Sequence, residues 1–137
     1  MVDVNYLNVL ISAVLAMVLG TVWYGFLFKK QWMEIIGVSG LTEEEQKMKQ
    51  RESMRLYFIQ FILVIMQAYV VTFYVKGFGT MIGIENALLL WFAFVMPTLA
   101  GSSMWTNDSR RISLMRFFIQ LGYQFLMFVV FGFILSM

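Results

Sequence analysis

The sequence contains no cysteine and no histidine. Without cysteine there are no disulfides and no thiol catalysis, and without histidine there is no histidine-ligated zinc or haem and no imidazole proton relay. Charged residues make up only 13% of the chain, whereas they make up about a quarter of a soluble domain. We therefore expect no metal, no cofactor and no nucleic-acid partner.

Hydrophobic residues are abundant, at 61%, and the mean hydropathy is +0.77. A bilayer core needs about 20 consecutive apolar residues in a helix, and the chain offers four such runs. The sequence therefore predicts an all-α membrane protein with one domain over residues 1–137. Its four transmembrane helices should form two hairpins, with spans at about 4–28, 56–75, 84–104 and 112–135.

The second span should extend beyond the membrane at its N-terminal end. Thr42 followed by Glu45 is a capping box, and no Pro or Gly intervenes before Gly77, so one helix is expected from Glu43 to about Val75. Its first turns are highly charged and should form a cytoplasmic extension of the second helix. The glycines at 77, 79 and 83 predict a short flexible connection, and Pro97 predicts a kink in the third span.

The basic residues indicate the orientation of the chain. Lys76 lies in the second connection, and the other nine lie in or beside the first and third, at positions 29, 30, 47, 49, 51, 55, 110, 111 and 116. Under the positive-inside rule these two loops are cytoplasmic and both termini lie outside. We expect a multi-pass protein of the cell (inner) membrane.

Small residues follow one another at a spacing of four in two of the predicted spans. Ser12, Ala16 and Gly20 share one helical face, and Ala93, Pro97 and Gly101 share another. Such faces let membrane helices approach closely, so both are predicted to be helix-packing faces. Tyr57–Phe61 (YFIQF) also resembles Phe117–Leu121 (FFIQL), which indicates a degenerate parallel 2+2 repeat with Ala16 equivalent to Pro97 and Gly20 to Gly101.

Polar residues within the spans are the only candidates for a ligand site. Arg116 and Gln120 share a face of the fourth span, and Gln60 lies at a matching depth in the second. The simpler interpretation is polar packing between helices, with Arg116 reaching to the interface. The alternative is a cleft that binds a small anionic or polar ligand, with Arg116 as its anchor and Asp108 or Glu52 as counter-ion. Its candidate residues are Arg116, Gln120, Gln60, Trp23 and Tyr24.

The order of residues also resembles a known family. The segment LGTVWYGFLFKKQWMEIIG with the acidic helix start after it, and RFFIQLGYQFLMFVVFGFIL near the C-terminus, are similar to domain-of-unknown-function family number 1761. The resemblance covers nearly the whole chain. It implies four spans in a bacterial membrane and implies no activity, so no functional residue can be transferred.

Three classes of function remain. A structural or accessory membrane protein, which associates through small-residue faces with itself or with a membrane complex, requires nothing that the sequence lacks. An oligomeric small-molecule or lipophilic-ligand binder, transporter or channel is the alternative. An enzyme is the least favoured, because the chain offers no His, no Cys and no carboxylate pair within the bilayer. We therefore expect a homo-oligomer or a partner in a membrane complex, and no enzymatic activity.

Overall fold

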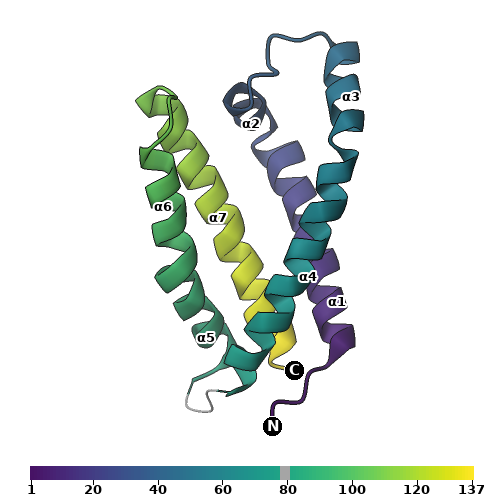
Figure 1. The fold of residues 1–137 in the computed structure, drawn as a ribbon, viewed down its shortest axis with the longest axis vertical. Coiled ribbons are helices and arrows are strands. Elements are labelled where there is room, and N and C mark those ends of the chain that lie inside the picture. The colour runs from purple at the N-terminus through teal and green to yellow at the C-terminus, as the bar shows by residue number, and fades with distance from the viewer. Residues whose placement is uncertain (78–80) are drawn as a thin grey trace.

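The computed structural model describes residues 1–77 and 81–137, and in these residues all regular structure is helical (Figure 1). Four segments are long and apolar enough to cross a membrane: Tyr6–Leu27, Met54–Gly77, Gly83–Met104 and Arg110–Leu135. Their ends lie close to the predicted ones, which confirms the all-α class. Gly79 of the predicted glycine-rich connection lies outside the described residues.

The bundle has two distinct ends. Both termini lie at one, which we call the terminal end (Figure 1). The other carries α2, α3 and the connection between α6 and α7, and we call it the basic end because nine of the ten Lys and Arg residues occur in or next to these segments. Lys76 lies at the terminal end, where its Nζ donates to the Asp3 carbonyl at 3.2 Å.

The first span consists of α1 (Tyr6–Val22) and a π-helical turn, η1 (Trp23–Leu27). Asn5 caps α1, because its side-chain oxygen accepts from the backbone N–H groups of Leu7 and Asn8. In η1 the Phe28 N–H donates to the Trp23 carbonyl at 2.9 Å, five residues back. The chain continues as α2 (Lys29–Ile35), and Gly37 follows with a φ of +79°, a conformation that glycine adopts without strain.

The second span and its predicted extension are divided into two helices, α3 (Glu43–Glu52) and α4 (Met54–Gly77). The predicted capping box is confirmed, since Glu45 N–H donates to the Thr42 hydroxyl and Thr42 N–H donates to the Glu45 carboxylate. The prediction of one uninterrupted helix is wrong at Ser53. The Ser53 hydroxyl donates to the Lys49 carbonyl at 2.8 Å, a contact by which serine bends helices.

The third span contains α5 (Gly83–Leu90), a second π turn, η2 (Trp91–Val95), and α6 (Met96–Met104). Pro97 has no N–H and lies in the first turn of α6. Just before it, the Met96 N–H donates to the Trp91 carbonyl, five residues back. The proline is therefore accommodated by a π turn, a local adjustment that is common in membrane helices.

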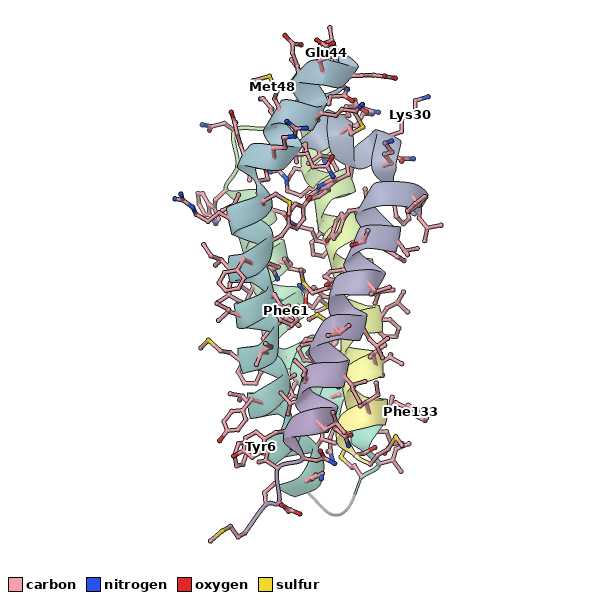
Figure 2. All side chains as sticks on the ribbon, turned by 90° about the vertical axis from the view of Figure 1, so that its right-hand side faces the viewer. Tyr6, Lys30, Glu44, Met48, Phe61 and Phe133 are labelled. Atoms are coloured by element: carbon pink, nitrogen blue, oxygen red, sulfur yellow. The ribbon has the colours of Figure 1, made fainter. Side chains whose placement is uncertain are left out.

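The central helix is α7 (Arg110–Leu135), which contacts α1, α4, α5 and α6. Its Met127, Phe131 and Leu135 side chains are the largest apolar groups that are fully buried. Because lipid gives helices no hydrophobic reason to associate, this interior is stabilised by close packing. Many other apolar side chains are exposed, and Figure 2 shows one of them, Phe133, projecting outward from its helix.

The third span is the least enclosed of the four. Only 6% of the residues in its most apolar 18-residue stretch are buried. The corresponding shares are 22, 28 and 39% in the first, second and fourth spans. It packs on α7 along its length, whereas α4 packs on α5 at the terminal end and then diverges from α6 toward the basic end (Figure 1). One side of α6 therefore has no partner within the described chain.

Candidate functional site

The small-residue face of the first span packs against α7. Ser12 and Ala16 are fully buried, and the Tyr123 hydroxyl donates to the Ala16 carbonyl at 2.9 Å. The Tyr123 ring lies over Gly20, so that a Cβ added at Gly20 would be 3.3 Å from it. The three small residues thus admit a tyrosine from the neighbouring helix.

The aromatic residues Trp23 and Tyr24 continue this contact toward the basic end. The Trp23 Nε1–H donates to the Ile119 carbonyl at 2.8 Å. The Tyr24 ring centroid lies 4.5 Å from that of Trp32 and 5.3 Å from that of Tyr123. Trp23 also fills the space over Gly122, where a Cβ would be 2.7 Å from its ring. Sequence reasoning missed this role of Gly122, although the glycine is conspicuous within a long apolar run.

Arg116 forms an ion pair with Asp108, one of the two counter-ions that the sequence suggested. Both side chains are partly exposed, at 26 and 33%. Gln120 is half-buried in α7, and Gln60 is exposed on α4. In the described part of the chain no hydrogen bond joins Gln60 to Gln120, although the sequence placed both beside one cleft.

The five residues of the predicted ligand site therefore have different surroundings. Trp23 and Tyr24 pack on α7, Arg116 is paired, and Gln60 faces outward. A cavity of about 460 Å³ between α6 and α7 is lined by Asp108 and not by Arg116. Ligand binding by these five residues stays a prediction, and among the described residues no group of three His, Cys, Asp or Glu side chains could hold a metal ion.

The small-residue face of the third span has a different environment. Ala93 and Pro97 are exposed, and a Cβ added at Gly101 would have no neighbour within 4 Å. This predicted packing face therefore does not pack within the described chain, and it is not equivalent to the face of Ala16 and Gly20. The reason is that α7 contacts the third span on another side. Trp91 lies on that side, and its ring packs edge-on against the Phe125 ring, with 5.1 Å between the ring centroids.

The two π turns show a likeness between the halves in another register. WYGFL at Trp23–Leu27 and WFAFV at Trp91–Val95 both begin with tryptophan and place a small residue third. This pairs Trp23 with Trp91, whereas the register predicted from the sequence pairs Gly20 with Gly101. π turns are frequent at functional sites, and here each introduces a tryptophan that contacts α7.

An ion pair fastens α2 to the start of α7. Arg111 Nη1 lies 2.6 Å from Glu34 Oε1, and both side chains are well exposed. The hydrogen bond from the Arg111 guanidinium holds the pKa of the Glu34 carboxyl below its ordinary value. This contact links α2 to the start of α7 on the exposed surface of the basic end.

A family model described as "Protein of unknown function (DUF1761)" matches residues 7–136. The chain belongs to this family. The match covers nearly the whole chain and confirms the resemblance that the sequence indicated. No curated protein and no solved structure matches it. Membership of DUF1761 brings no activity, so the function of the chain has to be argued from its geometry.

Proposed function

We propose that this DUF1761 chain is a non-enzymatic accessory protein of the membrane that associates with a second copy of itself through α6. The observation that carries the proposal is the face of Ala93, Pro97 and Gly101: Ala93 and Pro97 are exposed, and the space over Gly101 is open. In lipid, small residues at this spacing let two helix backbones approach closely. The corresponding face of the first span is already occupied by Tyr123.

A second copy fits this face for two reasons. All copies of a membrane protein share one orientation, so a twofold axis along the membrane normal brings the same face of α6 together in both. The hydroxyls on this part of α6 also need no partner from outside, because Thr98 donates to the Phe94 carbonyl and Ser102 to the Leu99 carbonyl. Two such faces meet without leaving a polar group unpaired.

The second candidate is an oligomeric binder, transporter or channel. Gln60 favours it, because an exposed amide on a membrane helix would line a polar axis between subunits. That arrangement requires contacts through α4, whereas the accessory role requires contacts through α6. The site of the subunit contact therefore distinguishes the two candidates.

We also propose that the chain resides in a bacterial cell membrane, with the basic end in the cytoplasm and both termini outside. The nine basic residues at one end, against Lys76 alone at the other, support this orientation.

The chain lacks cysteine, so single cysteines report the topology directly. Ser39→Cys lies in the loop between α2 and α3, and Met81→Cys lies beside α5 at the terminal end; both positions are exposed. An impermeant maleimide added to intact cells is expected to label Met81→Cys alone, and both variants after lysis. Labelling of Ser39→Cys alone in intact cells would reverse the orientation.

Self-association is tested by Gly101→Leu. The leucine has room within its own chain but keeps a second helix from approaching, so we expect the dimer affinity in mild detergent to fall roughly tenfold or more, with the thermal midpoint of the monomer unchanged. The matched control is Gly25→Leu, because Gly25 in η1 also has open space around it. Cross-linking and size measurements should show fewer dimers only for Gly101→Leu.

A wild-type chain that is monomeric, or a Gly101→Leu variant that dimerises normally, would disprove association through α6. Dimerisation lost on substitution of Gln60 and retained in Gly101→Leu would favour the second candidate.

A further inference from the structure

A cavity of about 670 Å³ at the basic end lies between α2, α3 and the start of α4. Tyr24 of η1 and Tyr57 of α4 both line it. Figure 2 shows the surrounding helices, with Lys30 on α2 and Met48 and Glu44 on α3. Since Leu27 ends the first apolar span and Met54 begins the second, the cavity lies where the apolar core of the bilayer gives way to the headgroups.

The cavity is positively charged. Three lysines line it, Lys29 from α2 and Lys47 and Lys49 from α3, with Glu43 as the one acidic lining residue. All three lysine side chains are exposed, and in the described residues none of them forms an ion pair. Lysine residues from two different helices therefore line a shared space, with a single acidic residue among the lining.

Part of the remaining lining is apolar. Met33, Ile36 and Val38 contribute aliphatic surface to the lining. The rings of Tyr24 and Tyr57 contribute surface that is apolar on the ring and polar at the hydroxyl. Tyrosines prefer the headgroup level of a bilayer, where one end of the ring meets hydrocarbon and the other meets water. The cavity thus offers cationic donors next to an apolar wall, at the depth of the lipid phosphates.

Two contacts fix the walls before any ligand arrives. The Gln46 side-chain amide donates to the carbonyls of Val38 and Leu41, at 3.1 and 3.2 Å, and so ties the connection to α3. The ion pair between Glu34 and Arg111 ties α2 to α7. A ligand therefore meets walls that are already in place, which lowers the entropic cost of binding.

We propose that this cavity binds the headgroup of an anionic phospholipid from the leaflet at the basic end. The phosphate lies among Lys29, Lys47 and Lys49, and the glycerol and first acyl carbons rest against Met33 and Tyr57. Each lysine near a negatively charged membrane surface adds favourable energy, so three lysines around the cavity favour an anionic lipid over a zwitterionic one. The binding requires neither the dimer nor the contact through α6.

The test titrates the purified chain, in a neutral detergent, with phosphatidylglycerol and in parallel with phosphatidylcholine. Thermal midpoints and native mass spectrometry of bound lipid give the affinity. We expect phosphatidylglycerol to raise the midpoint and to be retained. The variant Lys29→Gln/Lys47→Gln/Lys49→Gln should lose roughly tenfold or more of that affinity. The control Lys30→Gln/Arg51→Gln/Arg55→Gln removes the same charge outside the cavity and should stay near wild type.

Equal losses in the two triple variants would mean that only general surface charge is involved, and would overturn the proposal. Stabilisation of the wild type by millimolar inorganic phosphate to the same extent would assign the site to a free anion. If the cavity variant fails to fold, Lys47→Gln/Lys49→Gln and its control Arg51→Gln/Arg55→Gln decide in the same way, because all four residues are exposed at or near α3.

Discussion

Gly132→Ala is expected to lower the thermal midpoint of the chain strongly, although alanine is the better helix former by about 1 kcal/mol. Near the terminal end, α5 crosses α7 at Gly83 and Gly132. A Cβ at Gly132 would lie 2.6 Å from the Ile84 Cα and 2.9 Å from the Gly83 carbonyl oxygen. Both are backbone atoms, which cannot rotate away, so the two helices must separate. Overpacking of this kind costs roughly 1–3 kcal/mol.

The measurement is the loss of helical circular dichroism on heating in a mild detergent. The control is Gly25→Ala, which adds the same methyl group to a membrane helix where nothing lies within 4 Å. We expect its midpoint to equal or exceed that of the wild type, because it gains helix propensity without a clash. Equal midpoints for Gly132→Ala and Gly25→Ala would show that the crossing of α5 and α7 is wider than described.

The positions of the four spans follow from the sequence because each depends on local properties. A bilayer requires a run of apolar residues of fixed length, and the ends of the runs are marked by charges and aromatic residues such as Lys29 and Trp105. The capping box at Thr42 is local in the same sense, since its two partners are three residues apart. Predictions of this kind needed no knowledge of which helices are neighbours.

The packing could not be predicted in the same way, because it depends on contacts between distant residues. Gly20 and Gly101 occupy the same position in two similar patterns, yet only Gly20 has a tyrosine over it. The difference arises from the central place of α7, which no single segment of the sequence reveals. The close contact of Gly83 with Gly132 is likewise visible only once α5 and α7 are brought together.

In the candidate site, too, a contact within a short stretch of sequence could be predicted, and contacts between distant helices could not. Asp108, one of the two suggested counter-ions of Arg116, lies eight residues before it, and the two form an ion pair. Gln60 and Gln120 were predicted to lie at matching depths and to bound one cleft. Gln60 is instead exposed on α4, and Gln120 is half-buried on α7. Similar depth in the membrane does not determine which faces meet.

Gly20→Leu is expected to be the most damaging substitution on the face of Ser12, Ala16 and Gly20. Even a Cβ at this position would lie 3.3 Å from the Tyr123 ring, so a leucine must displace that ring. The displacement breaks the hydrogen bond from the Tyr123 hydroxyl to the Ala16 carbonyl and removes the ring contact with Tyr24. The cost should exceed that of Tyr123→Phe, which removes only the hydroxyl and with it about 1 kcal/mol.

A double-mutant cycle tests this mechanism, since Tyr123→Ala removes the ring that the leucine would strike. We expect Gly20→Leu to lower the thermal midpoint strongly in the wild-type background and only weakly in the Tyr123→Ala background, where the leucine occupies the vacated space. The coupling between residues in contact is typically about 0.5–3 kcal/mol. If Gly20→Leu costs the same in both backgrounds, then its effect does not pass through Tyr123, and the packing of α1 on α7 is not set by this pair.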